Sequence, residues 1–476
     1  MTDPSRRTHH RSCLPVRGWQ PRRFATVLAC GCLAGALTAP SAVATAAPSA
    51  GARVGAGPGP RATVGASAAT SSLVVAAPRP APDRISLMPG SDAATQLCIT
   101  WRTAEATRSG SVQIQRSSGG AVSTVAATSS LQSTTAGYRQ RFHTATVTGL
   151  TAGTSYRYRV GSGRAWTSWA TVRTSAGRLV PHSLLAMGDV QRGISTTWKS
   201  VVNRALTDKP SARALLLAGD LVNTSTSEAE WSQVFATVGP LARRMAMLPV
   251  VGNHEYAKAT SLTPQWRAQF PYPGADLGRR VPTALAGTVW STDIDGVRHI
   301  GLNGYYRIPK TAAGQTDWLK RQGEWLRRTV TTNPQRWTVV TFHYPVWSST
   351  PGRGNPELRK AWLPILESSG VDLVLQGHDH AYVRGQRTRT GTPGGPVGSG
   401  PVYVTSSSSS RQYPLSTRDW TTHGAVVARA FAGTPVYLAI DVTHDRLVYR
   451  AKDSSGRILD RFTMTKTGTT RTVTNR

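Results

Sequence analysis

Cysteine is nearly absent from the body of this chain. Three of its four cysteines, Cys13, Cys30 and Cys32, lie in the first 46 residues, and only Cys98 follows them. If the N-terminal segment is removed, no intramolecular disulfide can form, which excludes a fold stapled by disulfides. Cys98 lies in the alternating stretch QLCITW, which is typical of a β-strand, so we expect a buried structural thiol rather than a nucleophile.

Acidic residues are also scarce. The chain has 24 Asp and Glu against 56 Lys and Arg, a formal net charge of +32 over 476 residues. A surface this basic attracts polyanions through its field alone, whether phosphorylated substrates, wall polymers or nucleic acid. An Arg-rich surface that is merely solvated is an equal alternative, because no compact basic run with interleaved aromatic residues stands out.

Long apolar runs are missing after the N-terminus, so no later stretch approaches the ~18 apolar residues needed to span a bilayer. Residues 1–46 combine a basic leader, an apolar segment from Phe24 to Ala39 and the small residues Ala44-Thr45-Ala46. This pattern predicts a signal peptide and a secreted protein, with association to the cell wall left open. Arg22-Arg23 permits twin-arginine export, although ordinary secretion is the preferred route.

The remaining chain divides by composition. Residues 47–81 are rich in Ala, Gly, Pro and Ser and predict a disordered linker. Residues 82–175 hold short alternating segments separated by Gly, Ser and Thr, which indicates an antiparallel β-sandwich. In residues 179–465 apolar strands alternate with helical segments, which indicates a largely parallel sheet covered on both faces, and late strands are expected to complete a second sheet. Residues 466–476 are predicted to be a flexible tail.

Five apolar strands of the second region end in side chains that bind hard or borderline cations. These side chains are Asp189, Asp220, Asn253 with His254, His343, and His378 with His380. Taken singly, an Asp would cap the next helix and an Asn would make a turn. At one edge of a sheet, however, these residues apart from His254 supply two carboxylates, one amide oxygen and three imidazoles, a set suited to Zn, Mn or Fe. We therefore predict a metal site there.

The ordered motifs GD, GDLVN, GNHE, FHYP and GHDHAY resemble those of the calcineurin-like metallophosphoesterase superfamily. The run from Leu150 to Tyr158 resembles the tyrosine corner of fibronectin type III domains. A domain of that kind ahead of the catalytic one is similar to the purple acid phosphatase branch. The resemblance implies a two-sheet α/β sandwich metallophosphoesterase domain preceded by an all-β, fibronectin III-like sandwich.

The resemblance also implies a binuclear centre with two divalent or trivalent ions, Fe, Mn or Zn. Carried over residue by residue, it assigns Asp189 and His380 to one metal, Asn253, His343 and His378 to the second, and Asp220 to both. A hydroxide shared by the two ions would attack the phosphate ester in line.

Other positions gain expected roles from the same resemblance. His254 would contact the phosphate or protonate the leaving oxygen, and Glu255 would hold its imidazole ring. Tyr382 is a further candidate for substrate binding. Two positions depart from the pattern: Asn223 stands where purple acid phosphatases have the tyrosine that colours them, so this protein should not be purple, and Gln191 stands where the superfamily often has His. Gln191 is a candidate amide ligand, with a water in its place as the alternative.

The predicted function is an exported phosphomonoesterase resembling acid phosphatases, acting on small or polymeric phosphorylated substrates. A phosphodiesterase or nucleotidase that uses the same site is the alternative, favoured by the positive charge because diester polymers are polyanions. A non-catalytic, wall-associated binding protein is disfavoured, because all six core ligand positions are present.

Overall fold

The computed structural model describes residues 77–258, 260–468 and 470–475. The predicted signal peptide at 1–46, its Arg22-Arg23 pair and all of the predicted linker before residue 77 lie outside the described residues. Within them, no helix is long and apolar enough to cross a membrane.

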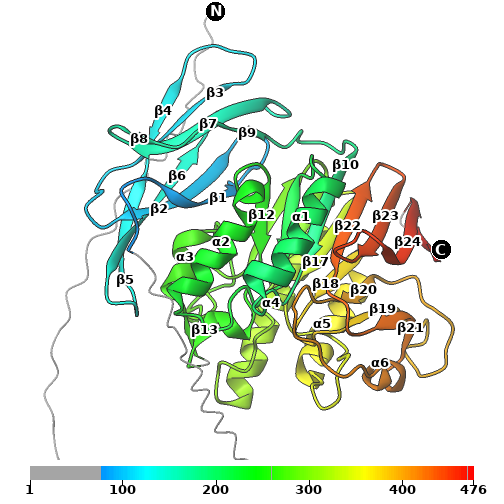
Figure 1. The fold of residues 1–476 in the computed structure, drawn as a ribbon. Helices are drawn as coiled ribbons and strands as arrows, with labels where there is room; N and C mark the ends of the chain where they lie inside the picture. Colours follow the sequence, from blue (N-terminus) through cyan, green and yellow to red (C-terminus); the bar gives the residue numbers. More distant parts are fainter. Residues whose placement is uncertain (1–76, 259, 469, 476) are drawn as a thin grey trace, which may run out of the picture. The chain divides into compact units, whose positions relative to one another are not determined.

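The N-terminal domain is all-β (Figure 1). Its strands are β1 (Asp83–Pro89), β2 (Leu97–Ala104), β3 (Ser111–Arg116), β4 (Ser123–Ala126), β5 (Thr128–Ser133), β6 (Arg139–Val147), β7 (Ser155–Ser162), β8 (Ala165–Trp166) and β9 (Ala170–Arg173). One sheet has the order β1-β2-β6-β5, and the other has the order β4-β3-β7-β8 with β9 also paired to β7. Their inner faces enclose a hydrophobic core that includes Trp101 and Val160. The hydroxyl of Tyr156 accepts a hydrogen bond from the Thr151 amide at 2.9 Å, which pins the turn into β7.

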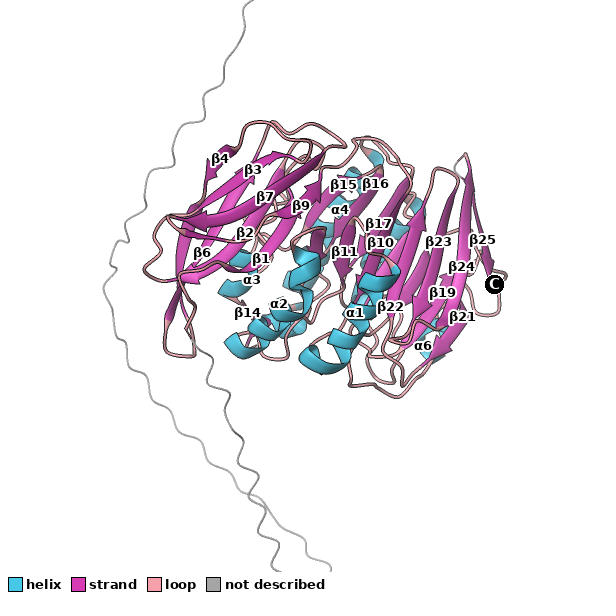
Figure 2. Cartoon of the chain, turned by 45° about the horizontal axis from the view of Figure 1, so that its top comes forward, coloured by secondary structure: helices cyan, strands magenta, loops and turns pink. Residues whose placement is uncertain are grey.

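The second domain begins with a seven-stranded sheet of order β12-β11-β10-β22-β23-β24-β25. Its strands are β10 (His182–Met187), β11 (Ala214–Leu217), β12 (Ala246–Pro249), β22 (Tyr437–Val442), β23 (Arg446–Lys452), β24 (Ile458–Thr467) and β25 (Thr470–Asn475). β10, β11 and β12 are parallel, and β22 pairs antiparallel with β10. The π-helix η1 (Ile194–Trp198) leads into α1 (Lys199–Asp208), which lies with α2 (Glu228–Ala242) beside this sheet (Figures 1 and 2). After β12 come the short elements η2 (Asn253–Glu255), β13 (Tyr256–Ala257), β14 (Ser261–Leu262) and α3 (Pro264–Gln269).

The other large sheet has the order β15-β16-β17-β18-β20-β19-β21. Its strands are β15 (Trp290–Ile294), β16 (Val297–Gly301), β17 (Trp337–Thr341), β18 (Leu373–Gln376), β19 (Tyr382–Arg387), β20 (Val402–Thr405) and β21 (Ala425–Phe431). β16, β17, β18 and β20 are parallel neighbours. The helices that accompany this sheet are α4 (Ala312–Thr331), α5 (Pro356–Ser368) and α6 (Arg418–Thr422). The Trp362 ring of α5 packs on Phe342, just after β17, with centroids 5.1 Å apart.

The two large sheets share one hydrophobic core. The central strands β11, β17, β18 and β20 are buried along their whole length, as expected for parallel strands covered on both faces. The predicted two-sheet α/β sandwich after an all-β domain is confirmed. The carboxyl ends of these buried strands are where the motif residues emerge.

The prediction of a flexible C-terminal tail at 466–476 was wrong for the described residues. β24 runs to Thr467, and β25 pairs antiparallel with it from Thr470 to Asn475. Side chains also anchor this strand: Asn475 accepts from Arg384 at 2.8 Å, and Arg471 lies 3.5 Å from Asp372. The alternating Thr, Arg and Val of TRTVTN are typical of an edge strand. This pattern was missed in the sequence because the segment is short and polar.

Candidate metal centre

The sequence-predicted ligands stand at the ends of five strands. Asp189 follows β10, Asp220 follows β11, and Asn253 and His254 lie in η2 after β12. His343 follows β17 in the other sheet, and His378 and His380 follow β18. The structure brings these ends of the two sheets together, so that residues up to 191 positions apart in sequence share one site.

One half of the site converges on the His343 ring. Its Nε2 lies 3.1 Å from Oδ2 of Asp220, 3.2 Å from Oδ1 of Asn253 and 3.3 Å from Nδ1 of His378. Asp220, His343 and His378 each offer a ligand atom, and all three atoms lie within 4.8 Å of one another. This is the geometry of donors that face one small cation.

The other half forms around Asp189, His380 and Gln191. Nε2 of His380 lies 3.6 Å from Oδ1 of Asp189. The Gln191 amide lies 3.1 Å from Oδ2 of Asp220 and 3.1 Å from Nε2 of His380. Asp220 therefore touches both halves, as a bridging ligand should. Oε1 of Gln191 is buried and has no hydrogen-bond partner, and a half-turn of the amide would turn this oxygen toward the same centre.

Four of these residues have a left-handed backbone. The φ angles are 51° at Asp189, 54° at Asp220, 77° at His378 and 48° at His380. A residue with a Cβ atom pays roughly 1–2 kcal/mol for this conformation, and it persists only where surrounding contacts hold it, often at functional sites. The tight turns aim each side chain back across the ends of the strands.

Motif glycines allow the strand ends to approach closely. A Cβ atom on Gly252 would lie 2.1 Å from Oδ1 of Asp220, and one on Gly377 would lie 2.8 Å from Oδ2 of Asp189. Any larger residue would push a candidate ligand out of place. The GN and GH pairs of the motifs are therefore packing requirements of the centre.

The buried carboxylates control the charge of the site. Burial lowers the pKa of His343, but Asp220 and then Asp189 outweigh it and raise the pKa to about 9. Burial raises the pKa of Asp189 well above its usual range. For Asp220, the opposing effects of His343 and His254 outweigh burial and lower the pKa. Asp220, with its lowered pKa, is therefore the main anion that pairs with the His343 ring, at the place where a cation would bind.

The outer nitrogens of the imidazoles are already engaged. Nδ1 of His343 lies 2.7 Å from the carbonyl oxygen of Ala218, and Nδ1 of His380 lies 2.8 Å from that of Arg411. These carbonyls fix the tautomer that leaves each Nε2 free to bind a metal. Burial lowers the pKa of His380 to about 4 and that of His378 well below its usual range, so both rings are neutral, as ligands must be. The residues therefore fit hard or borderline cations.

His254 lies beside this centre with 35% of its side chain exposed. Its amide donates to Oδ1 of Asp220 at 3.0 Å, and its Nε2 lies 4.0 Å from Oδ2. Nδ1 contacts the carbonyl oxygen of Asn223 at 2.6 Å. The prediction that Glu255 holds this ring was wrong: its carboxylate accepts from the amides of Gly252, Asp220 and Leu221. Glu255 thus ties the two motif loops together through their backbones.

The prediction that Tyr382 contacts substrate was also wrong. Tyr382 is only 2% exposed, and its ring stacks on Phe431 with centroids 4.4 Å apart. Its hydroxyl donates to Asp460 at 2.5 Å and lies 3.1 Å from that of Tyr449. Because β19 begins at Tyr382, strand alternation turns this side chain into the core between the sheets.

Sequence reasoning missed Arg353 and Tyr413. Nη2 of Arg353 lies 2.6 Å from Nε2 of His378, and its Nε donates to Asp379 at 3.1 Å. The Tyr413 ring stacks on that of His380 with centroids 4.4 Å apart, and the Arg353 guanidinium lies over it at 5.0 Å. Both residues come from loops without a recognisable motif. The only signal was Asp379, an acid placed between two candidate ligands.

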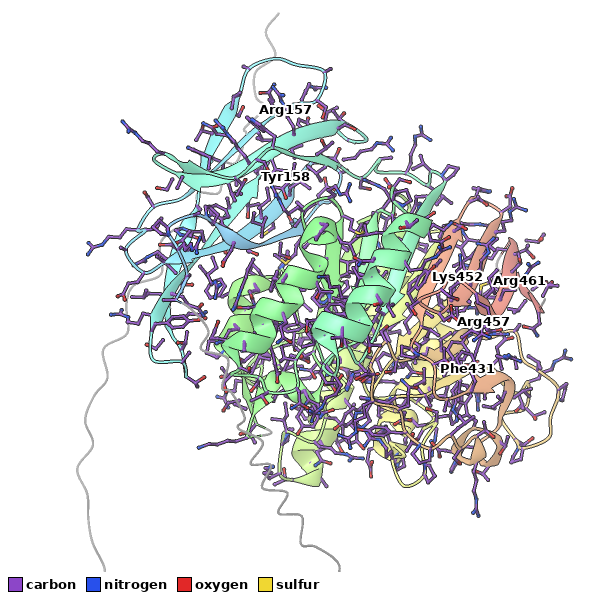
Figure 3. The ribbon with its side chains drawn as sticks, viewed as in Figure 1. Arg157, Tyr158, Phe431, Lys452, Arg457 and Arg461 are labelled. Carbon is purple, nitrogen blue, oxygen red and sulfur yellow. The ribbon has the colours of Figure 1, made fainter. Side chains whose placement is uncertain are left out.

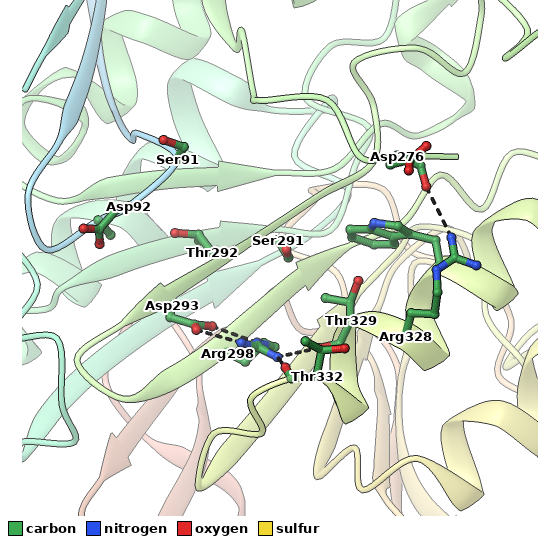
Figure 4. Close-up of a pocket in the computed structure, with 12 residues that line it drawn as sticks. Ser91, Asp92, Asp276, Ser291, Thr292, Asp293, Arg298, Arg328, Thr329 and Thr332 are labelled. Atoms are coloured by element: carbon green, nitrogen blue, oxygen red, sulfur yellow. Dashed lines mark hydrogen bonds and ion pairs between the residues drawn. The ribbon is translucent and has the colours of Figure 1, made fainter. Parts of the chain in front are cut away.

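Figure 4 shows a separate cleft of about 560 Å³. It is lined by residues of the β1–β2 loop, β15, β16 and the end of α4. Arg298, one of its charged residues, donates to both oxygens of Asp293 and to the carbonyl oxygen of Thr332. None of the candidate ligands lines this cleft, so we do not assign catalysis to it.

Comparisons with known proteins agree with the geometry. The model of the purple acid phosphatase N-terminal domain matches residues 82–174, and the calcineurin-like phosphoesterase model matches residues 182–382. Purple acid phosphatase 18 of Arabidopsis thaliana is 28% identical over 193 residues, which cover 38% of this chain and 41% of the relative. Purple acid phosphatase 15 of the same plant is 26% identical over 277 residues, covering 52% and 49%. The chain spans about half the length of the curated relatives it matches.

Solved structures show the same fold. The purple acid phosphatase PPD1 from yellow lupin (Lupinus luteus) seeds aligns with a TM-score of 0.64 at 16% identity, covering 81% of this chain and 74% of that one. The structure of PhoD aligns with a TM-score of 0.57 at 12% identity, covering 82% and 92%. The two model matches identify residues 182–382 as a calcineurin-like metallophosphoesterase domain and residues 82–174 as the N-terminal domain of purple acid phosphatases. The chain is thus similar to the purple acid phosphatase branch of that superfamily.

Proposed function

We propose that this protein is an exported phosphatase that hydrolyses phosphate monoesters at a centre for two cations. The observation that supports it is the convergence of two carboxylates, an amide and three imidazoles, with His254 at the exposed rim. Asp189 and His380 would hold one cation, Asn253, His343 and His378 the other, and Asp220 both. When bound, the two cations would polarise the phosphoryl group and acidify a coordinated water.

Residues of the site would also balance its charge, bind the phosphoryl group and donate a proton. Asp220 balances the charge between the two halves, and Gln191 offers its amide oxygen to the Asp189 side. Arg353 places a guanidinium beside His378, where it would attract phosphoryl oxygens. The Asn223 carbonyl holds Nδ1 of His254, which leaves Nε2 to donate a proton to the leaving oxygen.

A phosphodiesterase activity on the same site is the second candidate. Three arginines surround the centre: Arg353 contacts His378, Arg411 lies over Tyr413 at 5.1 Å, and Arg307 lies over Tyr344 at 5.5 Å. The positive charge of these arginines would attract a substrate that carries negative charges in addition to the phosphate that reacts. Comparing rates on 4-nitrophenyl phosphate and bis(4-nitrophenyl) phosphate separates the two activities.

Substitution of His254 tests the monoesterase proposal. His254→Ala should keep both cations and lower turnover of an alkyl phosphate by about 10²–10⁴, since an alkoxide needs protonation to leave. Turnover of 4-nitrophenyl phosphate, whose leaving group needs no proton, should fall less. His444→Ala, on an imidazole with 74% exposure, is the matched control. Equal losses on both esters with metal content intact would exclude the general-acid role, and loss of metal would make His254 a ligand.

Export and the division of the chain remain parts of this proposal. The leader at residues 1–46 supports secretion, and the composition shift near residue 82 supports a linker ahead of a first domain at 82–175 and a catalytic domain at 179–465. N-terminal sequencing of the protein recovered from culture medium tests both the export and the cleavage site.

A further inference from the structure

The outer face of one sheet in the N-terminal domain carries arginine and tryptophan side by side. Along β7, Tyr156, Tyr158 and Val160 point into the sandwich core. The alternate residues Arg157 and Arg159 therefore point outward. Arg157 and Tyr158 are labelled in Figure 3. Trp166 and Trp169, from β8 and the turn before β9, lie beside these arginines and are partly exposed.

Cation–π contacts order these four side chains into one surface. The Arg157 guanidinium lies 5.0 Å from the Trp169 ring, and that of Arg159 lies 4.8 Å from the same ring and 5.0 Å from Trp166. Nε of Arg159 also donates to Gln113 at 2.8 Å. We call Arg157, Arg159, Trp166 and Trp169 the Arg–Trp face. Because neighbouring groups already restrict its long side chains, a ligand would lose little side-chain entropy on binding there.

No carboxylate neutralises this face. Residues 106–188 contain nine arginines and no Asp or Glu. Among the described ion pairs, the only one that involves any of these arginines joins Arg139 to Glu105. The Arg–Trp face is therefore a positive surface with aromatic rings in it. Its residues lie in the stretch RYRVGSGRAWTSW from Arg157 to Trp169, a local basic–aromatic run that sequence reasoning missed.

Charge and aromatic rings together favour one class of partner. Guanidinium groups pair with backbone phosphates, and aromatic rings stack with bases, which is how proteins hold single-stranded nucleic acid without reading its sequence. A polyol phosphate would use the charges but leave the indoles without a role. The unpaired bases of a single strand are free to stack on indoles, whereas the bases of a duplex are already stacked on one another.

We propose that the Arg–Trp face binds single-stranded nucleic acid. This proposal does not rest on the phosphatase activity, because none of these four residues belongs to the candidate metal centre. It gives the N-terminal domain a binding function of its own.

Fluorescence anisotropy on the full protein tests this function. The probe is a labelled phosphorothioate oligothymidine of about 20 nucleotides, longer than the ~4–16 nucleotides held by one typical single-strand-binding fold. Its sulfur-substituted backbone resists hydrolysis. Arg157→Gln with Arg159→Gln should weaken binding by about ten-fold or more. If each arginine meets one phosphate, the slope of log Kd against log salt should fall by about 1.4.

The tryptophans are tested separately. Trp166→Ala with Trp169→Ala should weaken binding by about ten-fold while the salt slope stays the same, because stacking releases no counterions. The control is Arg389→Gln with Arg461→Gln, which removes two exposed charges elsewhere and should change Kd less than two-fold (roughly, from the loss of long-range field alone). Thermal melting monitored by circular dichroism confirms that each variant is folded.

Two results would overturn the proposal. One is a control variant that weakens binding as much as the arginine pair does, which would mean that net charge alone attracts the oligonucleotide. The other is inorganic polyphosphate binding as tightly as the oligonucleotide, with no effect of the tryptophan substitutions. That result would describe a general anion surface with no preference for bases.

Discussion

Nε of Arg353 lies 3.1 Å from Oδ1 of Asp379, and this ion pair ties a loop of the rim to the metal-binding motif. Asp379 is fully buried between His378 and His380 in sequence. Its other oxygen accepts from the Ser348 hydroxyl at 2.8 Å and from the Ser349 amide at 2.6 Å. Asp379 thus anchors the loop segment between the two candidate ligands to Ser348 and Ser349 and holds the Arg353 guanidinium in place.

Asp379→Asn is therefore expected to weaken metal binding without removing a ligand. The amide keeps the size of the carboxylate but loses the charge that holds Arg353, and changes of this kind typically lower metal affinity by about 10–100-fold. Competition with a chelator, followed by metal analysis of the protein, measures the affinity. Asp317→Asn, on an exposed carboxylate paired with Arg321, should leave it unchanged. If Asp379→Asn keeps its metal affinity, the Asp379 carboxylate is not needed to hold the metal-binding motif in place.

Asp220→Asn should be more damaging than Asp189→Asn. The Asp220 carboxylate lies 3.1 Å from both Nε2 of His343 and the amide of Gln191, whereas that of Asp189 accepts from the His378 amide at 2.8 Å. One substitution removes charge shared by both halves, and the other perturbs one half. Metal content and turnover of the two purified variants decide the comparison. Equal metal loss and equal rates would rule out a bridging role for Asp220.

Glu228→Gln should destabilise the contact between the N-terminal domain and the catalytic domain. Glu228 lies 2.8 Å from Arg84 and 3.4 Å from Arg102, and it accepts from the side chains of Gln140 and Gln265. Burial, with Arg102 adding to it, lowers the pKa of Arg84 to about 10. Removing the acid leaves the buried Arg84 guanidinium without its carboxylate, although Arg102 keeps its pair with Asp83. Breaking a buried pair in this way costs about 3–5 kcal/mol.

Urea unfolding of the full protein measures this cost. The matched control is Glu105→Gln, which breaks the exposed pair between Glu105 and Arg139, with side chains 46% and 54% exposed, and should cost less than about 1 kcal/mol. Similar losses in the two variants would show that the buried pair contributes no more than a surface pair.

The sequence predicted the positions of site residues best where a hydrophobic run ends in a motif residue. Asp189, Asp220, His343 and His378 each follow a buried strand, and parallel strands place their carboxyl ends at one edge. Their meeting across two sheets followed from the family resemblance alone, since periodicity does not say which sheets pack together. The contacts of Asp220 with His343 and Gln191 place its carboxylate between the two halves of the site.

The failures have physical causes. Tyr382 lies next to a motif, but the alternation of side chains along β19 points its ring into the core. A shift of one residue along the strand would have pointed it to the opposite face of the sheet. Glu255 adjoins His254, yet consecutive residues of a short turn point apart, so its carboxylate meets backbone amides instead. Arg353 and Tyr413 reach the centre through loops, whose paths depend on tertiary contacts such as the amide of Tyr413 donating to the His380 carbonyl at 3.2 Å.

Asp441 gives the protein a stability that depends on pH. Its carboxylate joins three elements: it accepts from Lys209 at 2.6 Å, from Ser183 at 2.6 Å and from Arg450 at 2.7 Å. Partial burial raises the pKa of Asp441, but these hydrogen bonds outweigh it and hold the pKa below its ordinary value of 3.8. The folded state therefore binds the proton more weakly than the unfolded state does.

The sign of the effect follows from this difference. Above the unfolded pKa, Asp441 is ionised and contributes its full stabilisation, which is lost as the pH falls through the folded pKa. Asp441→Asn should thus lower the free energy of unfolding by about 1 kcal/mol near pH 7, a modest value because the side chain is 29% exposed. The gap to the unsubstituted protein should narrow toward pH 3 (roughly, below the unfolded pKa). Urea unfolding at both pH values measures it, with Asp317→Asn, on a 46% exposed carboxylate, as the control. A gap that stays constant with pH would mean that Asp441 acts through its shape and not through its charge.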